Sequence, residues 1–125
     1  MKHKLLNKFS LSLLILIFFT CINCGYKVED KRIKKILKDK LKSSITLEKL
    51  AAIKDISFDN LNLTEIPNII LQMPYLERIS FKNNKLKQLP DYLINFIHLK
   101  EIDLTGNSFK EIPFILSQIP SLKKI

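Results

Sequence analysis

Few residues in this chain could carry out chemistry, and they are mainly thiols and imidazoles. The 125 residues include two cysteines, Cys21 and Cys24, and two histidines, of which only His98 lies away from the amino terminus. A nucleophilic site or a zinc site needs several such groups in one place. The two glycines, Gly25 and Gly106, are too few for a phosphate-binding loop. The sequence therefore predicts no enzyme, no metal site and no cofactor.

The two thiols follow an apolar run that has the layout of a secretory signal. Three lysines within the first eight residues precede the run, which covers residues 11–19, and the first acidic residue is Glu29. A run of this length is too short to span a bilayer comfortably. A basic start followed by an apolar centre is typical of an export signal. We therefore expect residues 1–23 to be a signal peptide.

The junction Thr20-Cys21-Ile22-Asn23-Cys24-Gly25 resembles a bacterial lipobox, the motif that ends on a cysteine to be lipidated. Ile and Asn before the second cysteine are similar to the permissive boxes of spirochaetal lipoproteins, whereas the stricter enterobacterial box has Ala or Gly there. The resemblance implies acylation of Cys24, with Cys21 as the alternative residue. An ordinary cleaved signal and an uncleaved anchor are the other interpretations. The implied location is a membrane of the cell envelope, with the outer membrane and the cell surface both open.

A basic segment follows the junction. Residues 27–42 contain eight Lys or Arg against three acidic residues, whereas residues 43–125 contain ten against nine. Four apolar residues of the segment recur at the spacing of one helix face: Ile33, Ile36, Leu37 and Leu41. This face either covers the open end of the structure that follows, or it lies on anionic headgroups beside the acyl anchor. Residues 46–52 predict a short second helix that completes such a cap. No aromatic residue stands among the lysines to stack on bases, so nucleic acid is not an expected partner.

The rest of the chain repeats one pattern of apolar residues at a constant interval. Ile53, Leu76, Leu99 and Leu122 open successive copies. Each complete copy begins with an alternation of apolar and polar positions that predicts a short strand. An asparagine after the strand, at Asn84 and Asn107, is expected to bond backbone groups of the neighbouring turn, whereas the first copy has Leu61 there. A proline follows, at Pro67, Pro90 and Pro113, where it suits the first position of a short helical turn.

This pattern resembles the 23-residue, Leu-Pro type repeats of bacterial leucine-rich-repeat proteins. The resemblance covers residues 53–125, with three complete copies and a fourth begun. It implies an α/β solenoid with short parallel strands on the concave face, short helical turns on the convex face and an N-terminal helical cap. The chain then divides into a signal peptide at 1–23, a lipidated N-terminus with the basic helical cap at 24–52, and the repeats at 53–125.

Leucine-rich repeats generally bind proteins through the concave face, which makes the outward residues of the strands the candidate binding site. They are Lys54, Ser57, Asp59, Arg78, Ser80, Lys82, Lys100, Asp103 and Thr105. Two columns alternate in charge along the copies: Lys54-Glu77-Lys100 and Asp55-Arg78-Glu101. Adjacent strands lie about 4.8 Å apart, so these charges are expected to pair laterally, for about 0–1 kcal/mol each. The face has no aromatic anchor, and we expect weak binding.

The sequence therefore predicts a non-catalytic binding protein, held at the cell envelope by a lipid anchor, whose partner is a protein or a surface polymer. One alternative is a structural or self-associating envelope protein whose open C-terminal end pairs with another chain, and Ile112, Leu116 and Ile119 would lie near that end. Another alternative is a truncated remnant of a longer repeat protein. On the convex side, Ile69, Tyr92 and Ile115 share one repeat position. They are expected either to pack between successive turns or to form an exposed contact stripe.

Overall fold

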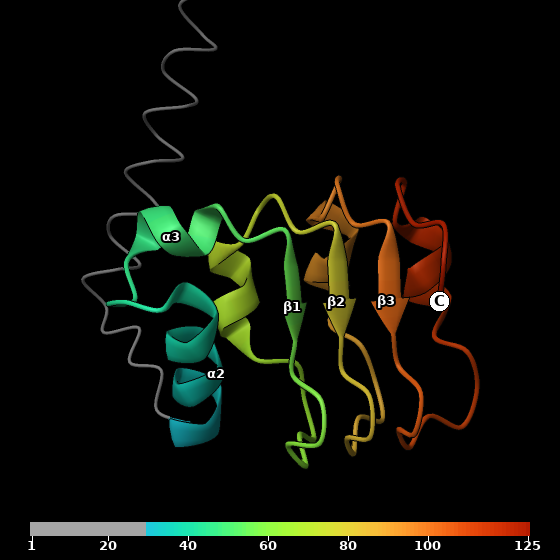
Figure 1. The fold of residues 1–125 in the computed structure, drawn as a ribbon. Coiled ribbons are helices and arrows are strands. Elements are labelled where there is room, and N and C mark those ends of the chain that lie inside the picture. The colour runs from blue at the N-terminus through green and yellow to red at the C-terminus, as the bar shows by residue number, and fades with distance from the viewer. Residues whose placement is uncertain (1–29) are drawn as a thin grey trace, which may run out of the picture.

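The computed structural model describes residues 30–125, which are coloured in Figure 1. The expected signal peptide and the lipidation of Cys24 or Cys21 lie outside these residues. Among the described residues, no helix has both the length and the apolar character needed to cross a membrane.

Helix α2, Lys31–Leu41, opens the described chain. Asp30 precedes it, and its carboxylate accepts a hydrogen bond of 2.8 Å from the backbone N–H of Arg32, as an N-cap residue does. The side-chain bond from Arg32 holds the pKa of Asp30 at about 2. The helix ends at Lys42, which has a left-handed φ of 51° and donates its N–H to Lys38 O. A second helix, α3, covers Leu47–Ala51.

The apolar face of α2 packs against the first strand region. Ile33 is 6% exposed and Leu37 is 0% exposed, and both belong to the core cluster that includes Ile56 and Phe58. The Arg32 guanidinium adds a polar link between the two parts, because its Nη1 donates to the carbonyl of Leu61. We call each copy of the repeated pattern, with the structure that it forms, a unit. Of the two uses expected for the apolar face of α2, packing over the first unit is confirmed.

Three short parallel strands form an open sheet in the order β1-β2-β3. They are β1 at Asp55–Ser57, β2 at Arg78–Ser80 and β3 at Glu101–Asp103. Their middle residues, Ile56, Ile79 and Ile102, pair in series and are all buried. Lys124 extends the neighbouring line of paired residues, Asp55, Arg78 and Glu101, through an isolated parallel bridge to Glu101. The predicted strands and their constant offset are therefore confirmed, and the chain has an α/β arrangement around this sheet.

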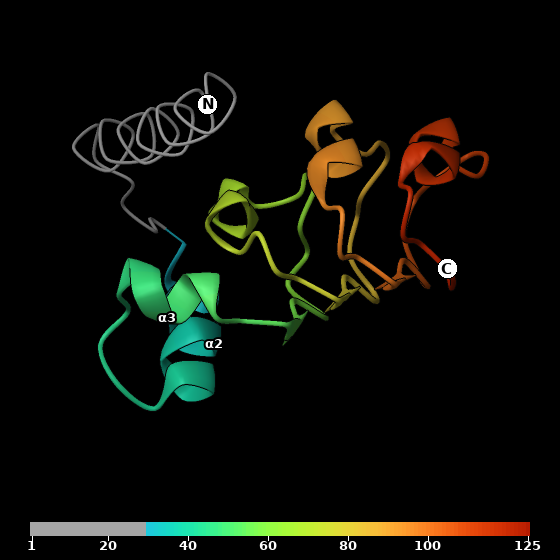
Figure 2. The ribbon, with the colours of Figure 1, turned by 90° about the horizontal axis from the view of Figure 1, so that it is seen from above.

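Three short 3₁₀ helices lie on one side of the sheet (Figure 2). They are η1 at Asn68–Gln72, η2 at Asp91–Asn95 and η3 at Phe114–Gln118. A proline stands immediately before each one: Pro67, Pro90 and Pro113. The sequence predicted each proline at the first helical position, whereas in the structure each lies one residue before it, at the N-cap. Each keeps an extended backbone, with ψ of 129°, 146° and 123°, and its carbonyl accepts the first bond of the turn.

Asn84 ties the first unit to the second from a buried position. Its Oδ1 accepts hydrogen bonds from the backbone N–H groups of Leu61 and Leu63, at 3.1 and 3.0 Å. Its Nδ2 donates to the carbonyls of Phe58 and Phe81, both at 2.8 Å. Asn84 is 5% exposed. Its side-chain amide forms hydrogen bonds with backbone groups that would otherwise be unpaired where the strands end.

Asn107 repeats much of this arrangement one unit later. Its Oδ1 accepts from Leu86 N at 3.0 Å, and its Nδ2 donates to Phe81 O at 2.9 Å and Leu104 O at 2.8 Å. The role predicted for the two asparagines is thus confirmed.

Burial decreases along the chain at equivalent positions. Ile66 is 4% exposed, Leu89 is half-buried and Ile112 is 80% exposed. Ile112 is one of the three residues expected near the open end of the repeats, and its exposure agrees with that expectation, because no described residue of a following copy covers it. Leu116 and Ile119 are buried nonetheless, at 3% and 4%.

Candidate binding surface on the sheet

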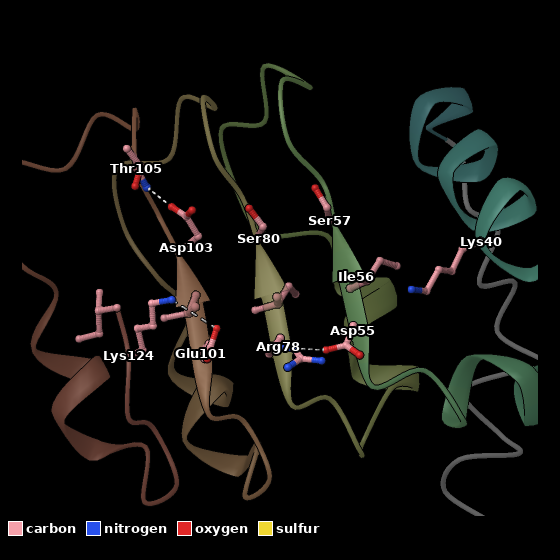
Figure 3. A pocket seen from close by; sticks show the side chains of 13 residues that line it. Lys40, Asp55, Ile56, Ser57, Arg78, Ser80, Glu101, Asp103, Thr105 and Lys124 are labelled. Atoms are coloured by element: carbon pink, nitrogen blue, oxygen red, sulfur yellow. Dashed lines mark hydrogen bonds and ion pairs between the residues drawn. The ribbon is translucent and has the colours of Figure 1, made fainter.

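The candidate surface is the face of β1, β2 and β3 turned away from the 3₁₀ helices, which we call the strand face. It holds an open pocket of about 560 Å³, shown in Figure 3. Nine of the thirteen residues that line it are polar or charged: Lys40, Asp55, Ser57, Arg78, Ser80, Glu101, Asp103, Thr105 and Lys124. The other four are Ile56, Ile79, Ile102 and Ile125, so apolar atoms also form part of its surface. The register explains this composition, because alternate residues of each strand point to opposite sides of a sheet.

The structure brings together five of the nine predicted site residues at this pocket. They are Ser57, Arg78, Ser80, Asp103 and Thr105. The other four, Lys54, Asp59, Lys82 and Lys100, do not line it. Asp59 instead serves the turn after β1, because its Oδ1 accepts from Ser80 Oγ at 2.5 Å and from Lys82 N at 2.8 Å. Three of the residues predicted to contact a partner, Asp59, Ser80 and Lys82, therefore hydrogen-bond to each other.

Lateral charge pairing follows the first predicted column. Glu77 lies between two lysines, with Lys54 Nζ at 3.3 Å and Lys100 Nζ at 2.6 Å from its carboxylate oxygens. The hydrogen bond from Lys100, with that from Lys54 next, lowers the pKa of Glu77 below its ordinary value. The predicted pairing in this column is confirmed.

The second charge column, Asp55-Arg78-Glu101, forms separate ion pairs, Asp55 with Arg78 and Glu101 with Lys124. Arg78 Nε lies 2.5 Å from Asp55 Oδ1, and this bond raises the pKa of the Arg78 guanidinium. Glu101 lies 3.8 Å from Lys124 Nζ and forms no ion pair with Arg78, although the sequence column placed the two side by side. Neighbouring opposite charges cancel at the starts of the strands, so this end of the pocket selects no ligand charge.

The ends of the strands carry a row of small polar groups. Ser57 pairs with Ser80, and Ser80 pairs with Asp103, in the parallel register. Thr105 donates its backbone N–H to Asp103 Oδ1 at 2.9 Å, and the hydrogen bonds from Thr105 lower the pKa of Asp103. This row offers hydroxyl and carboxylate oxygens that can hydrogen-bond to a partner lying across the strands.

Four polar lining residues were absent from the predicted set: Asp55 and Glu101, which the sequence predicted only as members of a charge column, and Lys40 and Lys124. Lys124 follows Glu101 by one repeat length and could have been found by extending the second charge column. Lys40 comes from α2, and its side chain reaches towards β1 at the edge of the pocket (Figure 3). Its position depends on how α2 packs on the first unit, which the apolar pattern does not specify.

Other reactive groups lie outside the pocket. His98 is exposed and its ring contacts that of Tyr75, with the centroids 5.7 Å apart. No cluster of three or more His, Cys, Asp or Glu residues suited to a metal occurs within residues 30–125.

Comparisons with protein-family models and with curated proteins found no match. The character of the strand face therefore has to be read from its own residues. These combine mutually paired charges with a row of hydroxyl and carboxylate oxygens, and they favour a polar partner held by hydrogen bonds.

Proposed function

We propose that the chain is a leucine-rich-repeat lipoprotein of the cell envelope, anchored through an acylated Cys24, whose strand face binds a protein or a surface polymer without catalysis. In this proposal residues 53–125 are three complete repeats of a solenoid and the start of a fourth. The observation that carries it is recurrence at one interval: each strand residue pairs with the residue 23 positions later, and the bond from Leu63 N to Asn84 is repeated 23 positions later by that from Leu86 N to Asn107. Such recurrence of one backbone arrangement is what a stack of equivalent units requires.

The character of the strand face supports binding rather than catalysis. Its carboxylates at Asp55, Glu77 and Glu101 are each within 4 Å of a cation. A general base or nucleophile needs a partner that activates it, whereas the ion pairs of these three carboxylates are made with arginine and lysine side chains. A surface of exposed ion pairs and hydroxyls contributes modest affinity, so recognition would be weak and geometric.

The lipid anchor is tested by the processing of the amino terminus. Cys24→Ser should abolish acylation and move the protein from the detergent phase to the aqueous phase, or leave unprocessed precursor. Cys21→Ser is the matched control and should leave both the mature mass and the partitioning unchanged. Mass spectrometry of the mature N-terminus reads the result directly. The reverse outcome would assign the anchor to Cys21, and no effect of either change would contradict lipidation.

Binding through the strand face is tested by cross-linking on intact cells. Ser57 is exposed in the pocket, and Ser57→Arg would place a large side chain across it. Ser117→Arg makes the same exchange at an exposed position on η3. We expect a cross-linked foreign partner that is lost in the Ser57 variant and kept in the Ser117 variant. Loss in neither variant would contradict the strand face as the site, and a product made only of this chain would favour the self-associating alternative.

A further inference from the structure

The charges of the described chain divide unequally between its two parts. Residues 30–52, which include α2 and α3, carry eight Lys or Arg against three Asp or Glu. Residues 53–125 carry nine against eight and are close to neutral. Five of the six excess positive charges of residues 30–125 therefore lie on the helical part, next to β1 at one end of the sheet (Figures 1 and 2).

The cations of α2 also differ from those of the sheet in their partners. Lys54, Arg78 and Lys100 each pair with a carboxylate of a neighbouring unit. The five lysines of α2 are exposed, and none forms an ion pair with a carboxylate of the described residues: Lys31, Lys34, Lys35, Lys38 and Lys40. The apolar face of the helix is already buried in the core, so its outward face is a layer of uncompensated ammonium groups.

A depression in this surface concentrates the lysines. It has a volume of about 640 Å³ between α2 and the loop to α3, and its lining contains no acidic residue: Lys34, Lys38, Ser43, Ser44 and Ile45. Lys34 and Lys38 are one turn apart on the same side of the helix. Lys49 of α3 adds a third ammonium beside it, since its Nζ donates to Ser43 Oγ at 2.8 Å. The Ser43 hydroxyl already donates to Leu41 O at 2.8 Å, so the donors that remain for phosphate oxygens are the ammonium groups and the hydroxyl of Ser44.

We propose that this basic depression docks the phosphate-bearing headgroups of an anionic phospholipid membrane. The inference rests on the proposed function in one respect, which is the acyl anchor at Cys24 that would tether the chain to the membrane. Cys24 precedes Asp30 by six residues, which reach about 20 Å when fully extended. An acyl anchor at Cys24 would thus hold α2 at the depth where lysines attract anionic lipid. The membrane contact then uses the helical part and leaves the neutral strand face to its partner.

The experiment uses the mature chain, residues 24–125, with Cys24→Ser so that no acyl chain contributes. The buried core of the described residues lies between Ile33 and Ile119, and circular dichroism with thermal unfolding checks that each preparation is folded. Flotation with vesicles of phosphatidylcholine alone or mixed with phosphatidylglycerol measures binding. We expect binding to the mixed vesicles that weakens as salt is added, and little binding to the neutral ones.

Two charge-matched double variants locate the contact. Lys34→Gln with Lys38→Gln removes two ammonium groups from the depression, whereas Lys85→Gln with Lys87→Gln removes two exposed ones from the sheet part. Each lysine near an anionic surface contributes about fivefold in affinity, so the first pair should weaken vesicle binding on the order of 30-fold. The second pair should change it by less than about twofold.

Three results would overturn the proposal. Equal losses in the two double variants would mean that net charge alone attracts the chain. Equal binding to neutral and anionic vesicles would exclude headgroup recognition. Calorimetric binding of inorganic phosphate without vesicle binding would make the occupant a soluble anion. Because the chain used here lacks the acyl chain, these results are independent of the Cys24 processing experiment, and either proposal can fail without the other.

Discussion

At the scale of single residues, Asn84 has the largest share of the polar bonding between units. Asn84→Ala would leave the backbone N–H groups of Leu61 and Leu63 and the carbonyl of Phe58 without their buried partner, whereas Phe81 O would keep its bond from Asn107. Unsatisfied buried groups cost about 1–3 kcal/mol each, and relaxation recovers part of this, so we expect a loss on the order of 3 kcal/mol in the free energy of unfolding. Urea denaturation measures it. Asn95→Ala, at an exposed position of η2, is the control and should change stability by less than about 0.5 kcal/mol.

Glu77 predicts a pH dependence whose sign follows from its two lysines. Its pKa in the folded chain lies below the ordinary value of 4.5, because Lys100 and Lys54 favour the carboxylate. The ion pair therefore stabilises the fold above the ordinary pKa, and that stabilisation is lost as the pH falls through the lowered one. Carbon-detected NMR of the Glu77 carboxyl should give a midpoint below 4.5. Lys54→Gln with Lys100→Gln should raise it, and an unchanged midpoint would contradict the assigned cause.

At the scale of elements, the helical part is an integral layer of the fold rather than an appendage. Leu37 is fully buried on α2, so Leu37→Ala should lower the free energy of unfolding by about 2–5 kcal/mol. Lys35→Ala, two residues away and exposed, is the control and should have an effect within about 0.5 kcal/mol. Thermal unfolding followed by circular dichroism compares them. Equal stability of the two variants would mean that α2 does not contribute to the cooperative core.

The strands, turns and helices were largely predictable because each depends on local periodicity. The alternation around Ile56, Ile79 and Ile102 specified the strands, and the proline spacing specified the turns to within one residue. The packing direction of α2, and with it the position of Lys40 beside the pocket, depends on contacts distant in sequence. The exposure of Ile112 likewise depends on whether a neighbouring unit covers it.

A second periodic signal was present but not used. Asn60, Asn83 and Gly106 recur once per unit, shortly after each strand, and have φ of 59°, 55° and 73°. Asparagine and glycine are the residue types that tolerate this left-handed region. A Cβ on Gly106 would also meet Oδ1 of Asn83, the end of a side chain that can move aside, so the left-handed φ is the main reason for glycine here. The turn after each strand could therefore have been predicted from residue type alone.

At the scale of the whole molecule, the burial gradient predicts uneven local stability. Phe81 is fully buried and its N–H bonds to Asp103 O at 2.8 Å, within the central part of the sheet. Ile102 N bonds to Lys124 O at 3.0 Å, across an isolated bridge. Native-state hydrogen exchange should therefore show Phe81 protected roughly tenfold or more above Ile102. Equal protection would indicate that the described units open together as one cooperative body.

The alternating charge columns also constrain how the number of units can change. Across the three complete copies, the columns Lys54-Glu77-Lys100 and Asp55-Arg78-Glu101 alternate in sign, and Lys124 extends the second column with a positive charge, whereas Lys123 repeats the sign of Lys100. Deleting residues 76–98 would keep the apolar register and yet place Lys54 beside Lys100 and Asp55 beside Glu101. Like charges on adjacent strands repel each other. The side chains of one copy therefore suit the charges of its neighbours, and such a deletion should cost stability that the apolar pattern alone does not reveal.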